Sequence, residues 1–109
     1  MNGIYYINES ISLSGHSKNE SIQFQKNALL DYIKDQHIQI TKLNRYQIND
    51  HYSILHALLY DLKKKGIQMD CLILFAPEVI NEFITTYPAR WILLKSFFSE
   101  IILLRASSF

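Results

Sequence analysis

The residues of this sequence that could do chemistry are three serines in one segment and the arginine at position 45. Ser10, Ser12 and Ser14 follow a short apolar run, and Arg45 follows a second one. A serine hydroxyl is a weak nucleophile unless a neighbouring group activates it, whereas a guanidinium can hold two phosphate oxygens at once. Together these residues could hold a phosphate or a nucleotide. The alternative is a serine-rich turn and an arginine on the surface.

The histidines and the cysteine do not indicate a metal centre. His51 and His56 are five residues apart, whereas two ligands on one helical face lie four apart. Cys71 is the only cysteine, so it cannot form a disulfide within the chain, which fits a reducing compartment. We therefore expect no metal, no cofactor and a cytoplasmic location.

The composition indicates a small globular domain that is nearly neutral. The chain has 109 residues, of which 49% are hydrophobic and 19% are charged, and its formal net charge is +1. Nucleic-acid binding depends mainly on neutralising phosphates, so we expect binding of DNA by this chain alone to be weak or absent. The longest basic run, residues 63–65, is expected to stabilise the end of a helix. Because no apolar run reaches the length of about 18 residues that a membrane span needs, we expect no membrane association.

Strands and helices are predicted to alternate along the chain. Apolar runs predict strands at residues 4–7, 38–43, 71–75 and 101–104. A capping box formed by Ser17 and Glu20 begins a helix that reaches about Gln36. A second helix is predicted from Asn49 or Asp50 to the stop at Gly66. Two more helices are predicted over residues 76–86 and 89–98.

This order predicts an α/β fold with a single domain over residues 1–109. The expected architecture is a mostly parallel four-stranded sheet with helices on both faces, joined by right-handed crossovers. In open parallel sheets, ligands bind beyond the carboxyl ends of the strands. Those ends are expected near residues 8–10, 44–45, 76–78 and 105–107, which makes Asn8, Arg45 and Glu78 candidates for binding.

The first third of the chain resembles the start of the catalytic domain of serine recombinases, the resolvases and invertases. Residues 6–10 (Tyr-Ile-Asn-Glu-Ser) stand where that family has Tyr-x-Arg-Val-Ser, and residues 21–25 (Ser-Ile-Gln-Phe-Gln) match its next pattern. The strand at 70–75 opens with Asp, as in the family. The resemblance covers most of residues 4–83 and is most specific over residues 6–25. It implies a resolvase-like fold with Ser10 at the position of the nucleophile that attacks DNA.

The arginines that this family uses to stabilise charge on the phosphate are missing here. The matching positions hold Asn8, His51 or Tyr52, Val79 and Glu82, with Glu78 at the acidic position before the last two. Removing one such group commonly costs about 2.7–4 kcal/mol of transition-state stabilisation, so removing several should abolish DNA cleavage. We also expect no separate DNA-binding domain.

We therefore expect a catalytically inactive serine-recombinase-like domain that acts through protein contacts. It would pair with itself or with another protein, in a regulatory or mobile-element setting. An apolar patch is the candidate for the partner surface, and it comprises Tyr87, Trp91, Phe97 and Phe98. The alternatives are a small phosphate- or nucleotide-binding protein, residual DNA recombination through Ser10, and a decayed remnant that only folds.

Overall fold

The longest helix begins at the serine that the sequence predicts as its cap. The computed structural model describes residues 1–13 and 15–105, and in it α1 spans Lys18–Asp35. The Ser17 hydroxyl accepts a hydrogen bond from the Glu20 amide at 3.1 Å, and the Glu20 carboxylate accepts one from the Ser17 amide at 2.8 Å. The predicted capping box is therefore confirmed. Among the described residues, no helix has both the length and the apolar character needed to cross a bilayer.

The strands form one parallel sheet with the order β2-β1-β3-β4. β1 spans Asn2–Tyr5, β2 Gln39–Ile40, β3 Met69–Leu74 and β4 Phe98–Leu103. Every adjacent pair of strands is parallel. β3 is almost entirely buried, as expected for a central strand covered on both faces. The predicted α/β fold is confirmed.

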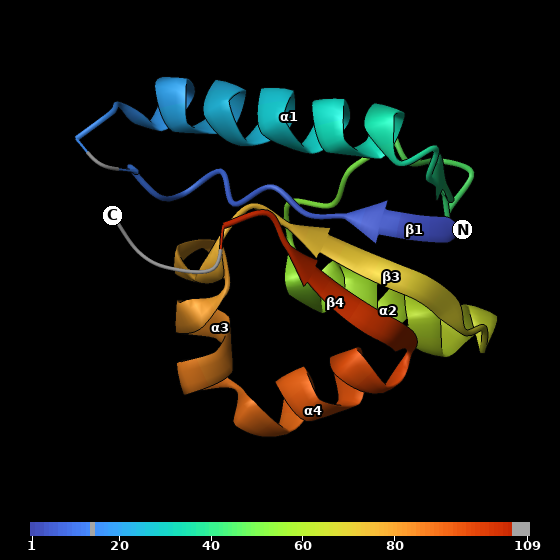
Figure 1. The fold of residues 1–109 in the computed structure, drawn as a ribbon. Coiled ribbons are helices and arrows are strands. Elements are labelled where there is room, and N and C mark those ends of the chain that lie inside the picture. The colour runs from blue at the N-terminus through green and yellow to red at the C-terminus, as the bar shows by residue number, and fades with distance from the viewer. Residues whose placement is uncertain (14, 106–109) are drawn as a thin grey trace.

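Helices cover both faces of this sheet, as Figure 1 shows. α1 lies on one face, and α2 (Leu55–Lys65), α3 (Asn81–Thr86) and α4 (Pro88–Ser96) lie on the other. Between β3 and α3, one turn of 3-10 helix, η1, spans Pro77–Val79. Each face has its own core. The smaller core, under α1, comprises Tyr5, Ile7, Leu29, Ile33, Ile38, Cys71 and Ile73.

The second helix begins later than the sequence predicts. α2 starts at Leu55, and its cap residue Ile54 is 60% exposed and makes no capping hydrogen bond, so the predicted start at Asn49 or Asp50 is wrong. The cause is Tyr52, whose amide donates to the Tyr5 carbonyl at 3.0 Å and whose carbonyl accepts from the Ile7 amide at 2.9 Å. These bonds hold the chain extended beside the end of β1, and the helix can begin only after them. The predicted strand at 38–43 shrinks to the two residues of β2.

The last strand also begins at a different residue from the prediction. α4 ends at Ser96, and β4 starts at Phe98, which pairs with Met69 of β3. The Met69 amide donates to the Phe97 carbonyl at 2.8 Å, so sheet pairing takes over where helical periodicity predicted more helix. Phe98 is only 7% exposed and belongs to the larger core. Its predicted place on a partner surface is therefore wrong, and Phe97 packs partly buried against the same core.

A substitution at Gly3 tests the close approach of β1 and β3. Gly3 pairs with Cys71, and a Cβ at residue 3 would lie 2.8 Å from Cys71 Sγ and 3.0 Å from a methyl carbon of Ile38. Gly3→Ala is therefore expected to lower the free energy of unfolding by about 1–3 kcal/mol, the usual cost of overpacking. Urea denaturation followed by circular dichroism measures this change.

The control for this prediction is a double-mutant cycle with Cys71→Ala. The single substitution Cys71→Ala deletes a buried sulfur and should destabilise the wild type. In the Gly3→Ala background the same deletion makes room for the new methyl group, so its cost should be smaller or reversed. Strictly additive effects of the two substitutions would contradict the predicted contact.

Candidate functional site

The carboxyl ends of β1 and β3 meet where the direction of the sheet reverses. After β1 the chain crosses to β2 on one side, and from β2 it returns to β3 on the other side of β1. Ligands of open parallel sheets bind at this kind of reversal. Here one hydrogen bond connects the two ends, because the Asn8 side-chain amide donates to the Val79 carbonyl at 3.0 Å. The structure therefore brings together two of the positions at which the resembled family carries arginines.

Internal hydrogen bonds engage both the side chain and the backbone of Asn8. Its side-chain oxygen accepts from the Ser10 amide at 2.9 Å, which fixes the turn after β1. Its own amide donates to Gln25 Oε1, and its carbonyl accepts from Gln25 Nε2, both at 2.9 Å. Gln25 lies on α1 and is fully buried. Asn8 thus joins β1, η1 and α1, and both ends of its side-chain amide are already occupied.

Ser10 lies on the rim of a pocket of about 270 Å³, called here the Ser10 pocket. The loop after β1, the start of α2 and the segment from η1 to α3 all contribute to it. The lining residues are Tyr6, Asn8, Ser10, Leu55, His56, Val79, Glu82, Phe83, Thr86 and Tyr87. The predicted nucleophile position and three of the residues at the missing arginine positions, Asn8, Val79 and Glu82, therefore share one pocket.

The charge of the Ser10 pocket is unfavourable for a phosphate. Among the described residues that line it, Glu82 is the only formally charged one, and there is no lysine or arginine. Burial, together with the nearby carboxylates of Glu82 and Glu9, raises the pKa of Tyr6 to about 12. Carboxylates that disfavour a tyrosinate at this point would also repel a phosphate oxyanion.

His56 is a pocket residue that the sequence analysis did not identify. Its ring packs against two aromatic rings, with centroids 5.2 Å from Phe83 and 4.6 Å from Tyr87, which themselves lie 5.6 Å apart. The Tyr87 ring meets it edge-on, at an interplanar angle of 89°. The three residues come from α2, from α3 and from the junction of α3 with α4, so no local sequence pattern could show that they meet. The cluster closes one wall of the Ser10 pocket.

At the one remaining arginine position, which falls on His51 or Tyr52, both residues make structural contacts. His51 Nε2 lies 3.4 Å from Glu9 Oε2, and the His51 side chain is only 9% exposed. The Tyr52 hydroxyl donates to Asp61 Oδ2 at 2.6 Å, which ties the loop before α2 to that helix. Burial, together with this hydrogen bond, holds the pKa of Tyr52 well above its usual value. Neither residue lines the Ser10 pocket.

Arg45 and Glu78, two predicted binding residues, lie outside the Ser10 pocket. The Arg45 guanidinium donates to the Tyr46 hydroxyl at 2.9 Å and lies 5.0 Å from the centre of that ring. It borders a different hollow, beside α2. Both carboxylate oxygens of Glu78 are buried and have no hydrogen-bond partner among the described residues. The structure therefore does not bring Arg45 to Ser10 as a substitute for a missing arginine.

The predicted partner surface loses Phe98, retains Phe97 only as a partly buried residue like Trp91, and gains two aliphatic residues. Tyr87 is 41% exposed, and Trp91 is half-buried with Lys95 Nζ 5.5 Å from its ring centre. The exposed side chains that sequence reasoning missed are Ile92 (66%) and Leu93 (40%) on α4. Their exposure follows from how α4 packs, since only Leu94 of that helix is buried.

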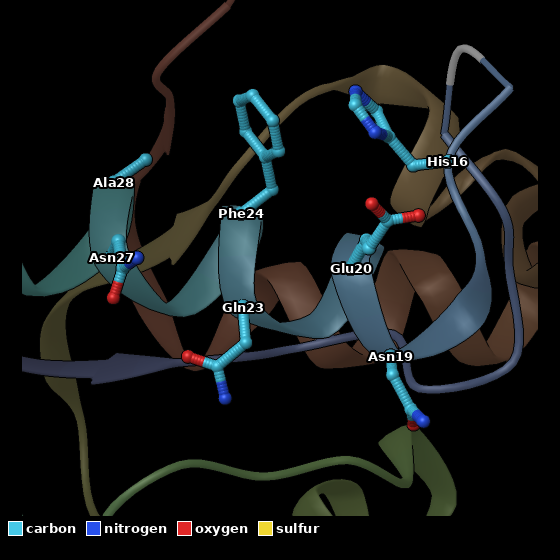
Figure 2. Close-up of a pocket in the computed structure, with 7 residues that line it drawn as sticks. All are labelled: His16, Asn19, Glu20, Gln23, Phe24, Asn27 and Ala28. Carbon is cyan, nitrogen blue, oxygen red and sulfur yellow. The ribbon is translucent and has the colours of Figure 1, made fainter.

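A larger hollow, of about 550 Å³, lies along α1 and the turn that precedes it. Figure 2 shows His16 and Phe24 on one side of it and Gln23 and Asn19 directed the other way. The rings of His16 and Phe24 are 5.0 Å apart. Because its walls come from one helix and the adjoining turn, this hollow does not gather groups from several elements, as the Ser10 pocket does.

Neither a metal-binding cluster among the described residues nor a similarity to known proteins assigns a function to the site. Within residues 1–13 and 15–105, no group of three or more His, Cys, Asp or Glu side chains is placed to hold a metal ion. No family model, no curated protein and no solved structure matches this chain. The residues of the Ser10 pocket therefore have to carry any functional argument themselves.

Replacing Gln25 tests whether the internal hydrogen bonds of Asn8 organise the site. Gln25→Leu keeps the side chain similar in size but leaves the Asn8 amide and carbonyl without partners. Each buried backbone group without a partner costs about 1–3 kcal/mol, so the free energy of unfolding should fall by several kcal/mol. Chemical denaturation measures the loss. The matched control is Gln23→Leu, which changes an exposed glutamine of the same helix and should shift the unfolding midpoint little; equal losses for both variants would refute the role of Gln25.

The raised pKa of Tyr6 predicts a loss of stability in alkali. A tyrosine whose pKa is about 10 in the unfolded chain and about 12 in the folded protein stabilises the fold fully below pH 10. This contribution disappears as the pH rises towards 12. Tyr6→Phe keeps the ring and removes the titration, so its free energy of unfolding should fall less steeply over this range. Urea denaturation at a series of pH values measures both slopes, and identical slopes would contradict the prediction.

Proposed function

We propose that this protein is a non-cleaving domain of the serine-recombinase type that acts through protein contacts. One observation carries the proposal: Ser10 lies in a pocket whose only formally charged lining residue, among those described, is the acid Glu82. The resemblance over residues 6–25 supports the kinship. The parallel α/β sheet, with Ser10 beyond the end of β1, agrees with it.

The chemistry of strand cleavage argues that this pocket is inactive. Phosphoryl transfer depends on positive groups that stabilise the charge on the phosphate oxygens. At the three matching positions inside the pocket, Asn8 is held by its own hydrogen bonds, Val79 is apolar and Glu82 repels an anion. His56, the one imidazole among the described lining residues, packs against Phe83 and Tyr87, and no hydrogen bond joins it to Ser10 in the described part of the chain. The same charge argues against the alternative of a phosphate or nucleotide site here.

Contacts with a protein are the role that the remaining surface supports. α4 and its N-terminal junction expose Tyr87, Ile92 and Leu93 to solvent, and exposed apolar groups that gather on one element often mark partner surfaces. The partner would be a second copy of the chain or another protein, in a regulatory or mobile-element setting. Cys71, the only cysteine, is free and buried, which suits our placement of the domain in the cytoplasm.

An assay for DNA cleavage tests the inactive assignment. Purified protein incubated with supercoiled DNA that carries candidate recombination sites should yield no nicked product and no covalent protein–DNA complex. Ser10→Ala and the matched control Ser12→Ala should behave like the wild type on denaturing gels. Nicked product with DNA linked to the Ser10 hydroxyl, lost in Ser10→Ala and kept in Ser12→Ala, would overturn the proposal.

A further inference from the structure

The structure concentrates positive charge in a groove between α2 and α4 that adjoins the Ser10 pocket and shares His56 with it. This α2–α4 groove has a volume of about 420 Å³. Its lining residues are His56, Leu59, Tyr60, Lys63, Lys64 and Arg90. The lysines come from the last turn of α2 and the arginine from α4, so the groove exists only in the folded chain. Lys63 and Lys64 therefore do more than stabilise the end of a helix.

A second hollow continues the positive surface on the other side of Tyr60. It has a volume of about 400 Å³, and it shares Tyr60 and Lys64 with the α2–α4 groove while adding Arg45 and Lys65. Among the described residues that line it, the only acid is Asp61, whose carboxylate already accepts a hydrogen bond from the Tyr52 hydroxyl. The two hollows together hold five of the eleven lysines and arginines of the chain.

The cations of the groove lack anionic partners. Lys63, Lys64 and Arg90 take part in no ion pair within the described part of the chain. Like charges on facing helices raise the local potential, and a bound anion would relieve it. The groove is thus complementary to a ligand that carries several negative charges.

The same surface also presents apolar groups. Tyr60 is 64% exposed between the two hollows, and Leu59 forms part of the floor at 2% exposure. Leu93 is 40% exposed and follows Arg90 by three residues on α4, a spacing that places both on one helical face. A ligand that fills this groove therefore needs apolar groups beside its negative charges.

We propose that the α2–α4 groove binds an acidic, amphipathic peptide segment of a protein partner. Grooves between helices commonly accept a segment whose apolar residues dock between the helices while charged residues meet the rim. Leucine-like side chains of the segment would contact Tyr60 and Leu93, and its carboxylates would pair with Lys63, Lys64 and Arg90. This inference rests on the proposed function and names the chemistry of the partner.

A nucleic acid fits the same surface less well. Affinity for nucleic acid depends mainly on how many phosphates the protein neutralises, and the two hollows offer only five cations among their described lining residues. Outside them the chain has six basic and nine acidic residues, so a polyanion that extends beyond the groove meets net repulsion. A short acidic segment avoids that repulsion, and its aliphatic side chains match Leu93 in a way that phosphates cannot.

Fluorescence anisotropy with a labelled peptide of glutamate and leucine at helical spacing tests the proposal. A peptide of about 15 residues in about 50 mM salt should bind the wild type, and its affinity should fall as salt is added. A peptide with every glutamate replaced by glutamine should bind at least about tenfold more weakly, a difference of 1.4 kcal/mol. Failure of the glutamate peptide to bind the wild type would overturn the inference.

Charge reversals locate the binding surface. Lys64→Glu combined with Arg90→Glu should weaken binding by about tenfold or more, and the milder pair Lys64→Gln with Arg90→Gln by less. The matched control combines Lys18→Glu with Lys26→Glu, two exposed lysines on α1 across the sheet, and should leave the affinity within about twofold. Far-UV circular dichroism verifies that every variant is folded. Equal losses in the groove and control variants would refute the assignment to the groove.

A labelled oligothymidylate of the same length separates the two classes of ligand. If it binds as tightly as the peptide and loses affinity with the groove variants, the occupant is a nucleic acid and the peptide assignment is wrong. A failure of the peptide assignment can be distinguished from a failure of the proposed function. Peptide binding can be absent while Ser10 remains unreactive, and a covalent Ser10–DNA link would overturn the non-cleaving role whatever the groove binds.

Discussion

The parallel pairing of β1 with β3 is the contact on which the rest of the structure depends. It runs through Gly3 and Cys71, where the side chains of Cys71 and Ile38 leave no room for a Cβ at residue 3. Because β2 lies on the other side of β1, this pairing reverses the direction of the sheet and sends α1 and α2 to opposite faces. It also brings the end of β1 to the end of β3, where Asn8 and Val79 of the Ser10 pocket are joined by a hydrogen bond.

Asn8 shows how this meeting point serves stability where the resembled family uses it for chemistry. Its side chain joins the turn at Ser10 to the carbonyl of Val79, and its backbone is held by the buried Gln25. An arginine at the same position could direct a guanidinium towards a phosphate, but it could not form this set of internal bonds. The resulting pocket is closed by hydrogen bonds and aromatic rings, and it has one acid and no strong base among its described lining residues.

Positive charge is concentrated on one surface of the molecule, although the net charge of the chain is small. A formal charge of +1 predicts little affinity for anions. Yet Lys63, Lys64 and Arg90 line one groove, and Arg45 and Lys65 line the hollow beside it. The sequence shows the three consecutive lysines, but Arg90 joins them only because α4 packs beside α2. The α2–α4 groove, rather than the Ser10 pocket at the strand ends where this fold is expected to bind ligands, is therefore the surface that favours anions.

The sequence by itself determined the features that depend on neighbouring residues. The capping box of Ser17 and Glu20, the left-handed stop at Gly66 and the apolar run of β3 each act over a few residues, so the alternation of elements and the α/β class could be predicted. Asn8 and Ser10 could be assigned to one end of the sheet because ligands of parallel sheets bind beyond the carboxyl ends of the strands, whereas Glu82 was indicated only by the resemblance.

Only the tertiary structure decided where α2 and β4 begin and what surrounds the site. Tyr52 delays α2 by pairing with the end of β1, and Phe98 leaves the helical pattern because Met69 of β3 pairs with it. His56 packs against Phe83 and Tyr87, and Arg90 lines the same groove as the α2 lysines, so both arrangements join different elements. At these points, hydrogen bonds and burial between distant segments outweigh the local preference for helix or strand. A sequence pattern does not reveal such contacts.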